Sequence, residues 1–181
     1  QRVDQPRSLY AATKAANELM GYTYAQLYGL HATALRFFTV YGPWGRPDMA
    51  PLIFSRAVLA GRPIEVFNHG KMQRDFTFVD DIVAGVLGAL DTPSTAPVPH
   101  RVFNLGNHTP VELETFIDVI AQAAGRAAEK VYRPMQPGDM IRTMADTQRA
   151  QAAFGFEPAT RVERGLPQVV HWCRQYFGER A

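Results

Sequence analysis

Two kinds of hydrophobic pattern alternate along this chain. In some segments apolar residues recur every three or four positions, which is typical of helices, and in others short apolar runs occur, which are typical of buried strands. Helices are therefore predicted over residues 10–28, 52–60, 82–90, 111–124, 146–154 and 161–177. Extended segments are predicted over residues 32–40, 64–67, 74–79, 101–106 and 130–135. The alternation indicates an α/β fold with parallel strands, although the strands are too few for a complete doubly wound sheet.

Residues that begin and end helices support these ranges. Three glycines are predicted to end helices, and these are Gly29, Gly61 and Gly155. Either Asp80 or Asp81 is expected to cap the third helix, because a carboxylate there can accept a hydrogen bond from a free backbone N–H. Thr109 is expected to cap the fourth helix, and Thr160 with Glu163 is expected to form a capping box for the last.

Composition narrows the class of protein. With 46% apolar and 20% charged residues, the 181-residue chain suits one soluble globular unit over residues 1–181. It has no apolar run long enough for a transmembrane helix, so no membrane partner is expected. A net charge of +2 is too balanced to predict nucleic-acid binding. Cys173 is the single cysteine and the five histidines have no ligand-like spacing, so we expect no metal site and a reducing, cytoplasmic setting.

Tyr10 and Lys14 form the first pattern that suggests chemistry. They are four positions apart in a predicted helix, so their side chains should share one face. A neighbouring ammonium group favours the phenolate form of a tyrosine, and such a pair can remove a proton from an alcohol while a hydride leaves the same carbon. The alternative on this spacing alone is an amphipathic helix whose lysine is solvated.

The residues around this pair carry a family resemblance. The segment "SLYAATKAANELM" (residues 8–20) resembles the active-site helix of extended short-chain dehydrogenases, the NAD-dependent sugar-nucleotide epimerases and dehydratases. The resemblance continues through "LRFFTVYGPWGRPDM", "GKMQRDFTFVDDI", "NLGN" and "MQPGDM", and is closest to the UDP-glucuronate 4-epimerase branch. It implies the C-terminal part of a Rossmann-like NAD(P)-binding fold plus a small α/β nucleotide-sugar-binding domain.

The resemblance implies a role for each matching residue. Tyr10 would be the general base and acid at the sugar 4-hydroxyl, and Lys14 would hold the nicotinamide ribose. Phe37, with these two, would contact NAD, and Phe38 would line the sugar site. Each phenylalanine lies in an apolar strand, so a place in the core is the alternative for either.

The remaining implied contacts are with the substrate. Thr39 would donate a hydrogen bond to the sugar carboxylate, and the charge of Arg46 suits an anionic sugar. Nucleotide contacts are implied for Met49 and Ala50, for Val66 and Phe67 beside the uracil, for Arg74 at the diphosphate and for Asp139 at the ribose hydroxyls. On their own, the two arginines could equally be solvated surface residues and the aspartate a turn residue.

One element expected of a complete enzyme has no counterpart in the sequence. No G-x-G-x-x-G motif occurs among the fourteen glycines. We therefore expect the C-terminal half of an epimerase, without the N-terminal glycine-rich half and with an incomplete NAD pocket. Its first helix should then expose an apolar face unless a partner covers it.

Two functions remain open at this point. The first is an isomerase that reversibly oxidises C4 of a UDP-sugar through a 4-keto intermediate, with a dehydratase or decarboxylase on the same scaffold as its variant. The second is a non-catalytic UDP-sugar-binding fragment. The resemblance also implies a possible homodimer through the Tyr10 helix, and polysaccharide biosynthesis as a fitting pathway.

Overall fold

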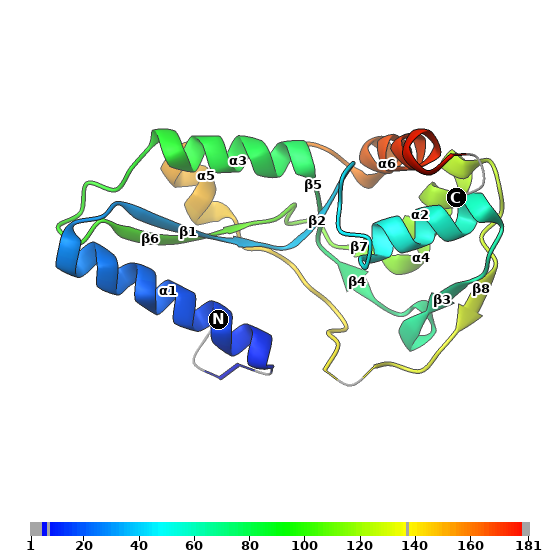
Figure 1. Ribbon diagram of the computed structural model, residues 1–181, viewed down its shortest axis with the longest axis horizontal. Coiled ribbons are helices and arrows are strands. Elements are labelled where there is room, and N and C mark those ends of the chain that lie inside the picture. The colour runs from blue at the N-terminus through cyan, green and yellow to red at the C-terminus, as the bar shows by residue number, and fades with distance from the viewer. Residues whose placement is uncertain (1–4, 7, 137, 179–181) are drawn as a thin grey trace.

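The computed structural model describes residues 5–6, 8–136 and 138–178 and is an α/β protein. Its helices are α1 (Leu9–Tyr28), α2 (Ala50–Ala60), α3 (Val79–Asp91), α4 (Leu113–Ala124), α5 (Gln148–Phe154) and α6 (Val162–Phe177). Its strands are β1 (Ala32–Phe37), β2 (Thr39–Tyr41), β3 (Ile64–Val66), β4 (Gln73–Arg74), β5 (Phe76–Phe78), β6 (His100–Leu105), β7 (Val111–Glu112) and β8 (Lys130–Tyr132). A 3₁₀ turn, η1 (Phe67–Gly70), follows β3. The predicted alternation of helices and strands is confirmed (Figure 1).

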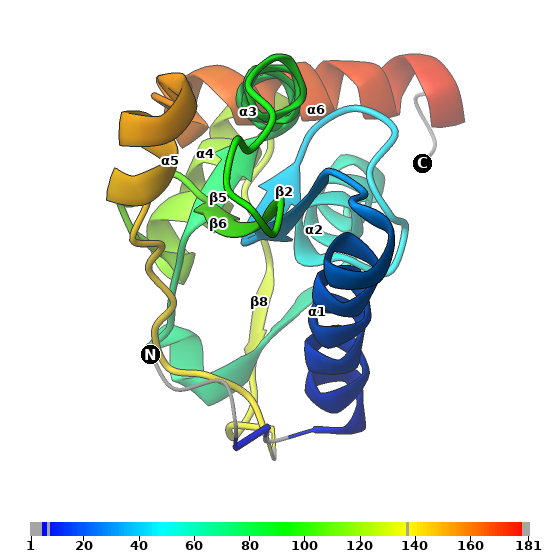
Figure 2. The same cartoon turned by 90° about the vertical axis from the view of Figure 1, so that its left-hand side faces the viewer.

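The strands associate in pairs. Parallel pairs are formed by β1 with β6, β2 with β5, and β3 with β8, as the alternation predicts, while β4 and β7 are antiparallel. In both views α3 lies on one face of the β1–β6 pair and α1 on the other (Figures 1 and 2). The helix that carries Tyr10 thus packs directly on this pair.

Two predicted strands are each interrupted by one residue. The segment 32–40 breaks at Phe38 and the segment 74–79 breaks at Asp75. The break at Phe38 has a clear cause, because this residue's N–H donates to Leu105 O of β6 at 3.0 Å. The N–H of Thr39 donates instead to Asp75 O at 3.2 Å. The chain therefore changes its pairing partner between these two residues.

The three helix ends predicted at glycines are confirmed, but the N-terminal caps predicted for three other helices are wrong. Each glycine lies just after its helix in the left-handed region, with φ of 66° at Gly29 and Gly61 and 69° at Gly155. Helix α3 begins at Val79, so Asp80 and Asp81 lie inside its first turn and do not cap it.

The capping box predicted for the last helix fails because its threonine has another partner. The N–H and hydroxyl of Thr160 donate to the Asp81 carboxylate at 3.0 and 3.2 Å, and Arg161 takes the cap position of α6. Helix α4 begins at Leu113 and not at 111, because Val111 and Glu112 pair with β4. Its cap residue is Glu112 and not Thr109.

The core has two parts. The larger is formed around Tyr41, whose ring packs edge-on against Phe76, Phe78 and Phe116, with α2, α4 and α6 closing over it. A smaller cluster between α3 and α5 contains Ile82, Phe103, Leu105, Ala150 and Phe156. These packed parts give the loops between them a rigid support.

Helix α1 is far less buried than the other long helices. Only Ala25 of its twenty residues is buried. Large apolar side chains stay exposed along it, among them Leu9, Leu19, Met20, Leu27 and Tyr28. The prediction that this helix exposes an apolar face is confirmed. Among the described residues, no helix is long and apolar enough to cross a membrane.

Candidate functional site

Tyr10 and Lys14 lie together on the first turns of α1. Ser8 caps the helix in an extended conformation, and its hydroxyl oxygen accepts a hydrogen bond from Ala11 N at 3.1 Å. One turn apart, the two side chains point the same way, and Lys14 Nζ lies 5.5 Å from the centre of the Tyr10 ring. The ring is 68% exposed, so a ligand could reach its hydroxyl directly. The shared face that the sequence predicts is therefore present.

An ion pair that the sequence analysis missed fixes α1 against β1. Arg36 donates from Nε to Glu18 Oε1 and from Nη2 to Glu18 Oε2, both at 2.6 Å. The hydrogen bond from Arg36 lowers the pKa of Glu18. Two signals could have pointed to the pair, because Glu18 lies one turn after Lys14 and Arg36 is the only charged residue in an apolar strand. The pair sets the position of the Tyr10 helix relative to the strand that ends at Phe37.

The three residues predicted next to the sugar follow one another where β1 gives way to β2. Phe37 ends β1 with its side chain 52% exposed, and Thr39 begins β2. Phe38, between them, packs so closely on Gly106 that a Cβ there would lie 3.2 Å from its ring. Phe37 is the more exposed of the two phenylalanines, while Phe38 is partly buried, and the ligand contacts of both stay predictions.

The loop over residues 42–49 joins β2 to α2 and carries Arg46. Its guanidinium forms a two-point ion pair with Asp48, with Nε–Oδ1 and Nη2–Oδ2 distances of 3.1 and 2.5 Å. The pKa of Arg46 is raised, first by the hydrogen bond to Asp48 and then by its charge, with a smaller contribution from Tyr10. Met49 caps α2, and Ala50 is its first residue.

Arg74 and Asp139 contact each other directly. Arg74 Nη2 donates to Asp139 Oδ1 at 2.7 Å, and Nη1 donates to Ile141 O at 3.3 Å. The two side chains are 16% and 34% exposed. A diphosphate that binds Arg74 would therefore approach a guanidinium already held in place, and would share or replace the carboxylate.

Val66 and Phe67 lie where β3 passes into η1. Val66 is fully buried, and its carbonyl oxygen accepts a hydrogen bond from Arg133 N at 2.9 Å. Phe67 is partly buried and packs against the larger core. Val66 therefore offers no exposed atoms to a uracil in this structure, and the roles of both residues stay predictions.

Asp75 is a second residue that the sequence analysis missed. Its fully buried carboxylate accepts backbone hydrogen bonds from Asn107 at 2.6 Å, His108 at 3.1 Å and Ala145 at 2.7 Å. Three N–H donors satisfy the charge without a cation. Asp75 thereby ties the loop after β6 to the segment that follows Asp139. A lone carboxylate within the apolar stretch "RDFTFV" was the available signal.

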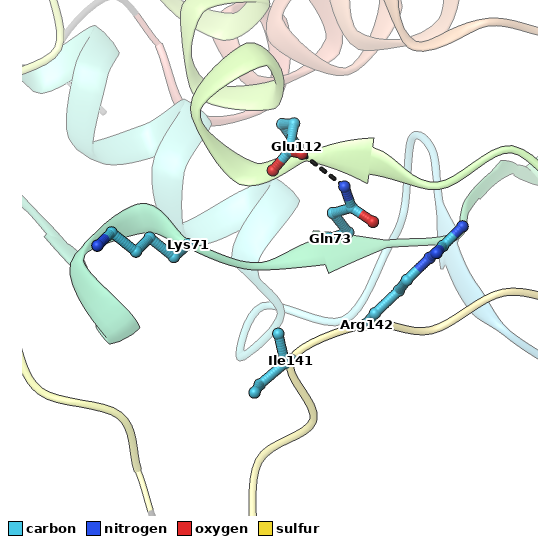
Figure 3. A pocket seen from close by; sticks show the side chains of 5 residues that line it. All are labelled: Lys71, Gln73, Glu112, Ile141 and Arg142. Carbon is cyan, nitrogen blue, oxygen red and sulfur yellow. Dashed lines mark hydrogen bonds between the residues drawn. The ribbon is translucent and has the colours of Figure 1, made fainter.

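A cavity of about 430 Å³ lies on the side of β4 that carries the Gln73 side chain (Figure 3). It is lined by Lys71, Gln73, Glu112, Ile141 and Arg142. Neighbouring residues of a strand point to opposite faces, so the side of Gln73 is not the side of Arg74. The cavity contains none of the predicted site residues. Within the part of the chain that the structure describes, no group of three or more His, Cys, Asp and Glu side chains could hold a metal ion.

Comparison with known proteins places these features in a family. The family model "NAD dependent epimerase/dehydratase family" matches residues 1–106. An uncharacterized 37.6 kDa protein of Escherichia coli O111:H- is 49% identical over 97% of this chain and 57% of its own length. A probable UDP-glucuronate 4-epimerase of Rhizobium meliloti is 44% identical over 97% of this chain and 56% of its own.

Solved structures give the same result. The UDP-glucuronic acid 4-epimerase of Bacillus cereus, in complex with UDP-glucuronic acid and NAD, superposes with a TM-score of 0.87 at 29% identity. The match covers 94% of this chain and 54% of that one. The chain spans about half the length of the curated relatives it matches.

Proposed function

Because this chain belongs to the NAD-dependent epimerase/dehydratase family, we propose that it provides the catalytic helix and the sugar-nucleotide pocket of a UDP-glucuronate 4-epimerase. The observation that carries the proposal is the arrangement around Tyr10. Lys14 Nζ lies 5.5 Å from the centre of its ring, on the same face of α1, and the ring is open to a ligand.

The proposed chemistry begins with a proton transfer at the sugar 4-hydroxyl. Tyr10 accepts this proton, and Lys14 lies beside it, one turn further along the same face of α1. After the sugar turns over, Tyr10 returns the proton to the oxygen of the 4-keto intermediate. The product is the epimer at C4, so no net oxidation occurs.

The exposed residues on this face suit the nicotinamide end of NAD. Lys14 can donate hydrogen bonds to ribose hydroxyls, and the exposed ring of Phe37 offers an apolar surface that excludes water. When bound, NAD would accept the hydride from C4 and later return it to the other face of the same carbon, which balances the two proton transfers at Tyr10. The protein's contribution at this site is to place the hydroxyl, orient the sugar and hold the proton at Tyr10.

Selection of an acidic sugar is assigned to Thr39 and Arg46. A hydroxyl and a guanidinium can both donate to a carboxylate, and a charged donor makes such hydrogen bonds stronger. Arg46 already binds Asp48 through Nε and Nη2, so a sugar carboxylate would use the remaining N–H donors of the guanidinium or replace Asp48. Arg74 and Asp139 serve the diphosphate and the ribose in the same proposal.

A non-catalytic UDP-sugar-binding role is the second candidate. Purification of the chain, absorbance of bound NAD and calorimetry with UDP-glucuronate separate the two. Bound NAD with formation of UDP-galacturonate supports the epimerase. UDP-glucuronate binding without NAD favours the binding role, and no binding of any UDP-sugar contradicts both.

The proposal extends to the setting of the protein. A cytoplasmic location, supply of an acidic sugar for polysaccharide biosynthesis and association of two copies through α1 all fit a UDP-glucuronate 4-epimerase. The exposed apolar residues of α1 support the last of these.

A further inference from the structure

Three aromatic rings join the Arg46 loop to the C-terminal helix. The Trp44 ring centre lies 5.2 Å from that of Trp172 and 5.0 Å from that of Tyr176, and the latter two rings stack on each other at 5.1 Å. Trp44 belongs to the loop over 42–49, and the other two belong to α6. We refer to Trp44, Trp172 and Tyr176 as the aromatic cluster.

The backbone at Trp44 is unusual for a residue with a large side chain. Gly45 N donates to Gly42 O at 3.3 Å, which closes a turn whose third residue, Trp44, has φ of 62°. That position usually carries glycine, because a Cβ is unfavourable there. Gly42, the first residue of the turn, packs so closely on the Val79 side chain that a Cβ on it would clash, so glycine is needed there too. A tryptophan therefore occupies a position that glycine would fill without strain.

Burial does not explain why tryptophan is present. Its ring remains 73% exposed, so little apolar surface leaves water compared with a core residue. What the ring does achieve is contact with α6, a helix whose other face is firmly set in the larger core by Leu166, Val169 and Val170. The strained turn thus directs Trp44 onto a rigid support.

The other end of the same loop carries Arg46. Met49 N donates to Arg46 O at 3.2 Å, and Met49 O accepts hydrogen bonds from the first turn of α2. Arg46 is therefore attached to α2 on one side and, two residues away on the other, lies next to the ring of Trp44. The ring contact with α6 adds to the attachment that the Gly42–Gly45 turn provides at the start of the loop.

We propose that Trp44 is a positioning residue that, through its packing on Trp172 and Tyr176, holds the loop over 42–49, and with it Arg46, in place for the sugar carboxylate. The proposal rests on the proposed function for its ligand. It adds that selection of the acidic sugar depends on the C-terminal helix, whose residues touch neither the sugar nor the nucleotide in that function.

The test uses two pairs of matched variants. Trp44→Gly suits the positive φ and removes the ring, while Trp44→Phe keeps a ring. Trp172→Leu leaves the loop sequence unchanged and keeps apolar packing on α6, while Trp172→Phe again keeps a ring. Circular dichroism and a thermal melt identify any variant that fails to fold, and the other pair then carries the test.

The first measurement is amide hydrogen exchange of residues 45–48, which requires no ligand. Exchange should increase in Trp44→Gly and Trp172→Leu and stay near that of the wild type in both phenylalanine variants. The second is calorimetry with UDP and with UDP-glucuronate. The non-aromatic variants should lose roughly tenfold in affinity for UDP-glucuronate, the lower range for one charge-assisted hydrogen bond, with UDP unchanged.

Two results would overturn the proposal. One is unchanged loop exchange in Trp172→Leu, and the other is an equal loss of affinity for UDP and UDP-glucuronate, which would mean general destabilisation. A wild-type chain that binds UDP but not UDP-glucuronate would instead contradict the proposed function. The exchange measurement would then still decide whether the aromatic cluster holds the loop.

Discussion

Arg74 and Asp139 form one ion pair, with Nη2 of the arginine 2.7 Å from Oδ1 of the aspartate, although 65 residues separate them. The resemblance gave them separate partners, the diphosphate and the ribose. Their contact means that the nucleotide would meet a charged pair already assembled by β4 and the segment after Gly138. Removing either residue therefore affects the other.

Replacing Arg74 by alanine should weaken UDP binding by roughly 1.5–3 kcal/mol, because a hydrogen bond to a charged group is lost and the Asp139 carboxylate then faces the diphosphate unpaired. Calorimetry with UDP measures the change. Arg74→Lys is the matched control, and should recover the charge but only part of the affinity, since lysine cannot bind at two points. Unchanged affinity in Arg74→Ala would place the arginine outside the site.

Replacing Tyr10 by phenylalanine should abolish 4-epimerisation in a full-length protein that carries this chain, since the phenol oxygen is the proposed proton acceptor. Affinity for UDP-glucuronate should stay near normal, because the change removes only the phenol oxygen. Folding should also be unaffected, since Tyr10 is 68% exposed. Product formation is followed by separating UDP-glucuronate from UDP-galacturonate. Near-normal turnover in this variant would remove Tyr10 from its role.

Replacing Thr39 by asparagine should shift preference from UDP-glucuronate towards neutral UDP-hexoses. The threonine begins β2 beside the exposed ring of Phe37, and its hydroxyl is the proposed donor to the sugar carboxylate. The ratio of the two affinities is the measured quantity, with Thr39→Ser as a control that keeps the hydroxyl. A constant ratio would mean that Arg46, or another residue, makes the selection.

The Glu18–Arg36 pair should make stability depend on pH. The pKa of Glu18 is lowered in the folded chain, chiefly by the hydrogen bond from Arg36. Because the pKa of Glu18 is lower in the folded chain than in the unfolded chain, the ionised side chain stabilises the fold at pH values above the ordinary glutamate pKa. This contribution is lost as the pH falls through the folded pKa. Urea unfolding of wild type and Glu18→Gln should differ by about 1 kcal/mol at pH 7, and converge in acid. A difference that persists in acid would rule out the charge as its cause.

Cys173 should be unreactive in the folded chain. It is fully buried in α6, and burial raises the pKa of its thiol to about 11, an effect that the charge of Arg56 only partly offsets. Thiolate is the reactive form, so alkylation by iodoacetamide at pH 7.5 should be slow and should accelerate on addition of urea. Rapid labelling without denaturant would show that α6 opens, and with it the support of the aromatic cluster.

Much of the fold could be predicted because its signals are local. The ends of α1, α2 and α5 at Gly29, Gly61 and Gly155 follow from backbone conformations that glycine adopts without strain. The shared face of Tyr10 and Lys14 follows from helix geometry alone. The caps failed where distant residues compete, since Thr160 donates to Asp81, 79 positions away, and not to its own helix.

The sequence by itself determined the helices and strands, the family and the residues that could do chemistry, because periodicity, end signals and motifs are properties of neighbouring residues. Only the tertiary structure decided that Arg74 pairs with Asp139, that Asp75 joins two loops and that Trp44 rests on α6. Such contacts join residues between 30 and 130 positions apart, so they depend on which strands pair and how helices pack. A pattern of neighbouring residues does not specify these contacts, because the free energy that favours them comes from burying surfaces that touch only in the folded chain.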